Sequence, residues 1–201
     1  MLEENKAMIE GFLTITDPET GEVFFDGPNS IHFENFSESL AFSMAHKNKG
    51  YIYQMSFGNG GSNVDPTGVI TYLPPNQTGQ SADLYNETYS KVVDENSASN
   101  TDPSRNSLTV VHTVGKVYTD ILVKCLLDYG EPSGQQAFDN STNVNGEFVF
   151  DELGLKTIGD TVNNLQLVTH VVFHPVQKSL NRQIQINYTI RIQSLTHIQS
   201  V

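Results

Sequence analysis

The sequence predicts a mainly β protein, an antiparallel β-sandwich with an N-terminal hairpin and one helix. The first observation is a series of runs rich in β-branched and aromatic residues, separated by turn-forming spacers. The second is strict alternation over residues 183–193, which places every apolar side chain on one face of a strand. The third is composition: only 17% of residues are charged, and Asn, Gln, Ser and Thr supply much of the polarity. Helical bundles are instead rich in Glu, Lys, Ala and Leu.

The N-terminal region, residues 1–50, is predicted to form a hairpin arm and a helix. Residues 8–16 are β-prone, residues 17–21 (Asp-Pro-Glu-Thr-Gly) have turn chemistry, and residues 22–25 return as a second strand. Apolar residues then recur every three or four positions over 33–46, which predicts a helix; they are Phe33, Phe36, Leu40 and Met44.

Three aromatic residues of the hairpin are candidate subunit contacts: Phe12, Phe24 and Phe25. Protruding arms commonly reach a neighbouring chain in oligomers, so we hypothesise that this hairpin docks on an adjacent subunit. The alternative is that these aromatics pack in the protein's own core.

Residues 51–201 are assigned to the β-sandwich domain, with a long loop insertion at 58–105. A strand is expected at 51–57, and the insertion that follows is crowded with Gly, Asn, Asp, Ser, Thr and Pro. Within it we expect a short strand at 69–72 and a helical turn at 83–89. Loops of this length are usually functional or ordered by a partner. Further strands are expected at 108–114, 117–127, 147–155, 165–173 and 183–192. The last of these should be a central strand or lie next to an edge strand, with one face exposed to solvent.

Charge and cysteine usage exclude several classes of protein. The chain has 11 Lys and Arg against 23 Asp and Glu, a net charge of −12, which argues against a nucleic-acid partner. No apolar run approaches the ~18 residues of a membrane span, and the acidic start at residues 1–6 is unlike a secretion signal, so we expect synthesis in a cytoplasm. Cys125 is the single cysteine, which rules out an internal disulfide, and its apolar surroundings predict burial.

The Gly-rich stretch 58–65 follows a predicted strand and is a candidate ligand-binding loop. It lacks a Gly-Lys-Ser/Thr ending and does not open a helix, so it is unlike a phosphate-binding loop. Calcium chelation through Asn59, Asn63 and Asp65 is the alternative, but the spacing does not match a helix-loop-helix calcium site. A structural turn is the preferred interpretation.

No catalytic or metal constellation is expected. His170 and His174 would stand about 13 Å apart on a strand, too far to share one metal ion. The neighbouring acids Asp151 and Glu152 should point to opposite faces of their strand, so adjacency does not make them an acid/base pair. We therefore expect no enzyme activity, cofactor or metal. Carboxylates far apart in the sequence can still converge, so a hydrolase with dispersed acids is the competing hypothesis.

The C-terminal half resembles a known family. The carrying motifs are Phe-Asp-Glu-Leu-Gly-Leu at 150–155, the run 167–178 that includes Phe-His-Pro-Val-Gln-Lys, the alternating strand to Ile192, and Met-Ser-Phe-Gly-Asn-Gly-Gly at 55–61. Together they resemble small virion structural proteins of tailed bacteriophages. The resemblance covers residues 51–192. The insertion at 71–105 and the N-terminal hairpin with its helix depart from the family pattern.

The resemblance implies a non-enzymatic virion structural protein at the neck or collar of the head-tail junction, or decorating the capsid on the outside of the head. It implies a homo-oligomer whose partners are other virion proteins: portal, connector, capsid or tail proteins. A tail or baseplate component is one alternative. A carbohydrate-binding β-sandwich module is another, because exposed Tyr72, Tyr85 and Tyr89 could stack on sugars, although the chain has no Trp.

Overall fold

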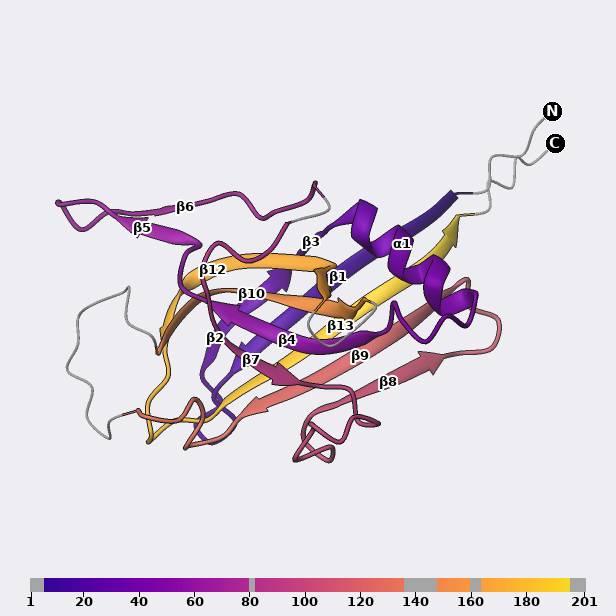
Figure 1. Cartoon of the computed structure of the whole chain (residues 1–201). Coiled ribbons are helices and arrows are strands. Elements are labelled where there is room, and N and C mark those ends of the chain that lie inside the picture. Colours follow the sequence, from indigo (N-terminus) through magenta and orange to yellow (C-terminus); the bar gives the residue numbers. More distant parts are fainter. Residues whose placement is uncertain (1–5, 80–81, 136–147, 160–163, 196–201) are drawn as a thin grey trace.

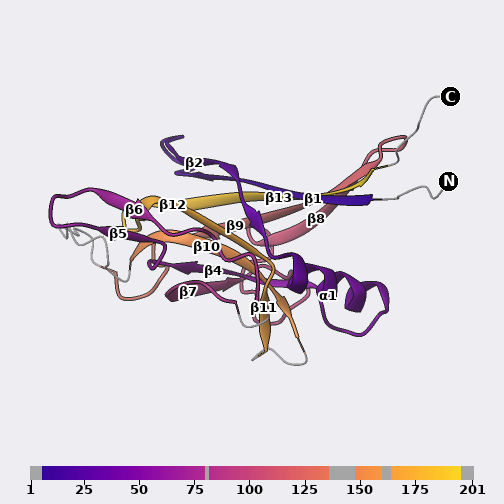
Figure 2. The ribbon, with the colours of Figure 1, turned by 90° about the horizontal axis from the view of Figure 1, so that it is seen from above.

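The computed structural model describes residues 6–79, 82–135, 148–159 and 164–195. Two antiparallel sheets lie face to face, as Figure 2 shows from above. The predicted fold class, a mainly β antiparallel sandwich with one helix, is confirmed.

The first sheet has the strand order β2-β1-β13-β9-β8 (Figure 1). Its strands are β1 (Lys6–Thr16), β2 (Val23–Pro28), β8 (Ser107–His112), β9 (Tyr118–Leu127) and β13 (Ile184–Leu195). The predicted hairpin is part of this sheet, because β1 pairs with β13 from Lys6↔Leu195 to Thr16↔Gln185. The last strand is central as predicted, since β13 lies between β1 and β9.

The second sheet has the order β3-β12-β10-β4-β7, with β11 paired to β10, and a separate pair is formed by β5 and β6. Its strands are β3 (Ser30–Ile31), β4 (Ile52–Gly58), β7 (Glu87–Val92), β10 (Val149–Ile158), β11 (Leu165–Leu167) and β12 (Thr169–Gln177), and the pair is β5 (Ser62–Val64) with β6 (Ile70–Tyr72). The β10–β12 register shifts between Phe150 and Glu152. Pro175 of β12 lies opposite this shift. Proline has no N–H to donate, and because the regular ladder of hydrogen bonds is already interrupted here, no ladder bond is lost.

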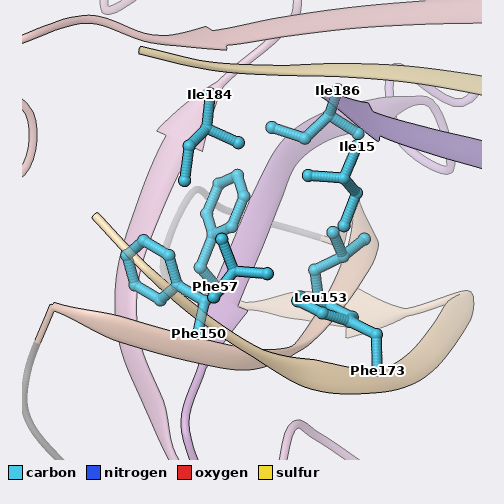
Figure 3. A pocket seen from close by; sticks show the side chains of 8 residues that line it. Ile15, Phe57, Phe150, Leu153, Phe173, Ile184 and Ile186 are labelled. Atoms are coloured by element: carbon cyan, nitrogen blue, oxygen red, sulfur yellow. The ribbon is translucent and has the colours of Figure 1, made fainter. Parts of the chain in front are cut away.

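The hydrophobic core fills the space between the two sheets. Side chains of β13 alternate between the two faces of the sheet, and those on the inner face enter the core. Buried there are Ile184, Ile186, Tyr188 and Ile190. The packing leaves a void of about 10 Å³, into which apolar side chains from both sheets point (Figure 3). Its lining is Ile15, Phe57, Phe150, Leu153, Phe173, Val176, Ile184 and Ile186. A void of this size without polar partners does not hold an ordered water.

The helix α1 (Phe33–Met44) lies where the sequence predicts one, ending two residues early. His32 caps it, its Nδ1 accepting a hydrogen bond from the Asn35 N–H at 3.3 Å. However, two of the four apolar residues that predicted the helix are not buried: Phe33 is 64% exposed and Met44 is 80% exposed. Phe36 is buried in the core, and polar contacts beside it also hold the helix, because Asn35 donates to the Leu167 carbonyl and Ser39 bonds Thr157.

The insertion at 58–105 carries β5, β6 and β7. The predicted strand at 69–72 is confirmed as β6, whereas the predicted helical turn at 83–89 is wrong: residues 85 and 86 form a bend, and the chain enters β7 at Glu87. Hydrogen bonds that residues 85 and 86 make with the sheet, described next, hold this bend. Residues 59–62 and 83–87 pack on the outer face of β10 and β12, away from the core.

Candidate functional site

Four buried polar side chains on the second sheet hold the insertion in place, and we call them the loop clamp: Asp151, Glu152 and Lys156 of β10, and His170 of β12. Their exposed fractions are 1%, 0%, 5% and 0%. Charged groups are almost never buried unless they are paired. The clamp is therefore the strongest candidate in the described chain for a site with a specific task.

Glu152 is the centre of the clamp. Its Oε1 accepts hydrogen bonds from the N–H groups of Gly60 (3.1 Å) and Asn86 (2.8 Å), and its Oε2 accepts from the Tyr85 N–H (2.9 Å). The fourth donor is His170 Nε2, 2.9 Å from Oε2. A carboxylate offers about four acceptor sites, so this group is fully used. One side chain thereby ties together two parts of the insertion that are 25 residues apart.

His170 extends the clamp to a third part of the insertion. Its Nδ1 accepts a hydrogen bond from the Asn76 N–H at 2.8 Å. Because Nδ1 is the acceptor, the ring proton of a neutral imidazole belongs on Nε2, which donates it to Glu152. The ring of Tyr85 covers the imidazole with ring centres 5.7 Å apart. His170 therefore binds the Asn76 backbone through one ring nitrogen and the Glu152 carboxylate through the other.

Asp151 binds the same turn as Glu152. It accepts hydrogen bonds from the N–H groups of Gly61 (2.9 Å) and Ser62 (2.8 Å) and from the Ser62 hydroxyl (2.5 Å). The expectation that neighbouring acids of a strand serve opposite faces is wrong at this position. The register shift between Phe150 and Glu152 interrupts the regular alternation, and both carboxylates meet residues 60–62.

The environments of these two acids move their pKa values in opposite directions. Burial raises the pKa of Asp151, and its hydrogen bonds to Ser62 and Gly61 offset this only in part. Burial acts on Glu152 in the same sense, but hydrogen bonds from His170, Asn86 and Tyr85 outweigh it and hold the pKa below the ordinary value. Glu152 is therefore the ionised partner on which the clamp depends.

Lys156 binds the start of β7. Its Nζ lies 2.5 Å from Asp83 Oδ1 and 2.5 Å from Glu87 Oε2. Burial alone would lower the pKa of Lys156, but these two acids outweigh it and raise the pKa. Ser56 of the adjacent strand donates to the other Glu87 oxygen at 3.1 Å. The same strand therefore holds the insertion with two acids and one base.

This arrangement binds the insertion through its backbone N–H groups and through the carboxylates of Asp83 and Glu87. A catalytic acid or base must reach the substrate, whereas each clamp side chain is buried and already bonded to the insertion. Among the described residues, no group of three or more His, Cys, Asp or Glu is placed to hold a metal ion.

The three predicted subunit-contact residues lie in the hairpin of the first sheet and differ in solvent exposure. Phe12 is 46% exposed. Phe24 and Phe25 are partly buried against the core, with the Arg182 guanidinium over the Phe24 ring at 4.9 Å and the Phe25 ring 5.9 Å from that of Phe173. The structure thus does not bring the three side chains together on one exposed surface.

The Gly-rich stretch is a turn on the clamp. Asn59 is largely buried and its Oδ1 accepts a hydrogen bond from Asn86, while Asp65 accepts from the N–H groups of Thr67 and Val69 in its own turn. His174 lies apart from His170, bonded to the Tyr72 hydroxyl at 3.1 Å. These contacts account for the candidate ligands other than Asn63, which is exposed.

Cys125 is buried in the first sheet, as predicted, and burial raises the pKa of its thiol to about 12. Of the three tyrosines considered for sugar binding, Tyr72 and Tyr85 are exposed, whereas Tyr89 is partly buried and packs on Phe57. They do not form one platform.

Two grooves open on the described surface. The first, of about 600 Å³, follows the outer side of β7 and is lined by Asn59, Asn86, Glu87, Thr88, Tyr89, Pro132, Ser133 and Phe148. The second, of about 540 Å³, is lined by Tyr51, Ile52, Tyr53, Asp94, Asn96, Ser97, Ala98, Ser99, Leu108 and Ile158. The second includes an aromatic side chain, Tyr51, that is 41% exposed beside Asp94 and Asn96.

Known proteins provide no further guide. Comparisons of the chain with protein-family models, with curated proteins and with solved structures found no match. In the part of the chain that the structure describes, no helix is long and apolar enough to cross a membrane.

Sequence reasoning missed the loop clamp. The signal was present: residues 150–156 place two acids and a lysine within a run that reads as a core strand. Charges in such a strand require buried partners. The sequence did not indicate which partners, because those in the insertion lie 66 to 92 residues away.

Proposed function

We propose that this protein is a non-enzymatic structural subunit of a bacteriophage virion, located at the neck or collar or on the outside of the head. The observation that carries the proposal is the loop clamp. The buried ionisable side chains of β10 and β12 fix the shape of a long insertion instead of facing a substrate. A rigid sandwich with one firmly held insertion is suited to presenting a constant surface to neighbouring subunits.

The family resemblance supports the same proposal. Its motifs at 55–61, 150–155 and 167–178 fall in β4, β10 and β12 and in the turn that the clamp holds. In the Glu-Leu-Gly-Leu motif, Gly154 is required by space: a Cβ there would lie 2.4 Å from the Thr169 carbonyl oxygen. The motif thus belongs to the part of the fold that shapes the insertion, as expected for a structural protein.

The test is binding to virion assemblies. Purified protein would be mixed with portal, capsid and tail assemblies of tailed phages and examined by negative-stain imaging, with its mass measured by light scattering alone and in the mixtures. Symmetric rings or regular decoration of heads support the proposal. A protein that leaves all of these assemblies bare contradicts it, and decoration of tails or baseplates moves the site of action to the alternative location.

A second candidate function is carbohydrate binding, favoured by the groove that holds Tyr51 beside Asp94 and Asn96. An exposed aromatic ring next to amide and carboxylate groups is a common arrangement for sugar recognition. Screening against a glycan panel would test it. Binding that is lost in Tyr51→Ala but kept in Tyr72→Ala, a matched exposed tyrosine outside this groove, would support this function.

A further inference from the structure

Within the described residues the sandwich has four sheet edges, and three of them are protected against pairing with another chain. The β2 edge contains Asp26, Gly27 and Pro28, and the register of its pairing with β1 shifts. The β3 edge is two residues long. The β7 edge carries Glu87 and Lys91, and Lys91 is bonded to Glu131 and to the Leu126 carbonyl. Short strands, charges, proline and bulges are the usual devices that block edge-to-edge pairing.

The fourth edge, β8, has none of these devices within the strand itself. Its sequence Ser-Leu-Thr-Val-Val-His contains no acid, lysine, glycine or proline, and its six register pairs with β9 run without a shift. Figure 1 shows β8 at the border of the first sheet, and no other strand of the described residues pairs with its outer side. Its side chains include Val110, which is 70% exposed, and Val111, which is 42% exposed.

The backbone groups that face outward on β8 can be identified. The Leu108 N–H donates to Glu95 Oε2 at 3.0 Å, so it points away from β9. On the other strand the Leu126 N–H donates to the Asn106 side chain, on the β8 side. In an antiparallel ladder alternate residues bond the same neighbour. Hence Leu108, Val110 and His112 direct their N–H and C=O groups outward, and Glu95 already occupies the first of these donors.

Charge favours another copy of this chain as the occupant. The net charge of −12 disfavours contact between two copies over most of their surface. Residues 107–118, which span β8 and its turn into β9, contain no Asp or Glu and one lysine. Two copies can therefore approach through the part of β8 beyond Leu108 without bringing acids directly opposite each other, because Glu95 is bonded at Leu108 itself.

We propose that β8 is a self-association edge: it pairs antiparallel with β8 of a second copy, about a two-fold axis at Val111, joining two five-stranded sheets into one. In this register Val110 lies opposite the second copy's His112, and the pair exchanges both backbone hydrogen bonds, giving four across the axis. Val111 meets its own counterpart, a favourable β-branched pair. In this register the Leu108 N–H keeps its hydrogen bond to Glu95. The proposal specifies the homo-oligomeric contact of the proposed virion subunit and rests on that function for its biological role.

The experiment is a charge-swap series at Val111. Light scattering and sedimentation are expected to show wild type at twice the chain mass of 22.3 kDa. Val111→Lys and Val111→Glu each place like charges at the axis and should each raise the dissociation constant at least about tenfold. An equimolar mixture of the two variants should restore the dimer. Val23→Lys, at an exposed valine on the opposite edge of the same sheet, is the matched control and should remain dimeric.

The possible outcomes test the β8 pairing separately from the proposed virion function. A wild type that is monomeric throughout the micromolar range, or a dimer that Val111→Lys leaves intact, overturns the β8 pairing. So does a mixture of the two charge variants that stays monomeric while circular dichroism shows both folded. A monomer that still decorates phage heads refutes the pairing alone, whereas a β8 dimer that binds no virion assembly refutes the proposed function alone.

Discussion

Replacing Glu152 by Gln should release the insertion from the sheet. The carboxylate accepts four hydrogen bonds, from the N–H groups of Gly60, Tyr85 and Asn86 and from His170. A glutamine has the same shape but one carbonyl oxygen, which can accept two of them, and its NH₂ group would face the other two donors. Each buried donor left without a partner costs about 1–3 kcal/mol, so the variant should lose about 2–6 kcal/mol. That is a large part of the ~5–15 kcal/mol that stabilises a typical domain.

Thermal unfolding and limited proteolysis together test this expectation. For a chain of this size, a loss near the middle of that range lowers Tm by on the order of 10 °C. Cleavage within residues 59–79 or 82–86 should become faster, because their anchor is weakened. Glu34→Gln, at an exposed acid on the first turn of α1, is the control and should change stability by less than about 0.5 kcal/mol. A variant within 1 kcal/mol of wild type, with its insertion equally resistant to protease, would refute the structural role of Glu152.

The pH dependence gives an independent check on the same residue. The folded-state pKa of Glu152 is held below its ordinary value of 4.5, so ionised Glu152 stabilises the fold above pH 4.5. This stabilisation is lost as the pH falls through the lower folded pKa. Asp151 acts in the opposite sense, because burial raises its pKa and favours the protonated form. The Glu152→Gln variant should therefore show a smaller fall in Tm below pH 4.5 than wild type, and an unchanged acid limb would contradict the assignment.

Three further predictions concern packing and reactivity. Gly154→Ala should destabilise the protein by about 2–4 kcal/mol in urea unfolding, since the new Cβ would overlap the Thr169 carbonyl, whereas Gly130→Ala, with open space around it, should be close to neutral. Leu153→Ala should enlarge the core void and cost about 2–5 kcal/mol by the same assay; a smaller loss would mean that the core collapses around the site. Cys125 should react with a thiol reagent only as fast as the protein unfolds, because burial raises its pKa to about 12; rapid labelling of native protein would argue against the buried position.

Local patterns were sufficient for the fold class and for most elements. Strict alternation over 183–193 predicts the central strand β13, because side chains of a strand alternate faces whatever surrounds it. Spacing of three and four predicts α1 for the same reason. The pattern identified only part of the helix face that is buried, because Phe36 lies in the core whereas Phe33 and Met44 are exposed. Asn35 and Ser39 face the sheet because it offers them a carbonyl and a hydroxyl, and such partners are not visible in the helix sequence.

The sequence by itself determined where most of the strands form and that no internal disulfide holds them together. Only the tertiary structure decided the role of the charged residues in β10. Residues 150–156 look like a core strand with misplaced charges until the fold brings Gly60, Asn86 and Glu87 to them. The same holds for β8, whose sequence resembles other strands and whose unprotected edge appears only once the strand order is known. The physical reason is that periodicity acts between neighbours in the chain, whereas burial and hydrogen-bond partners depend on which distant segments come together.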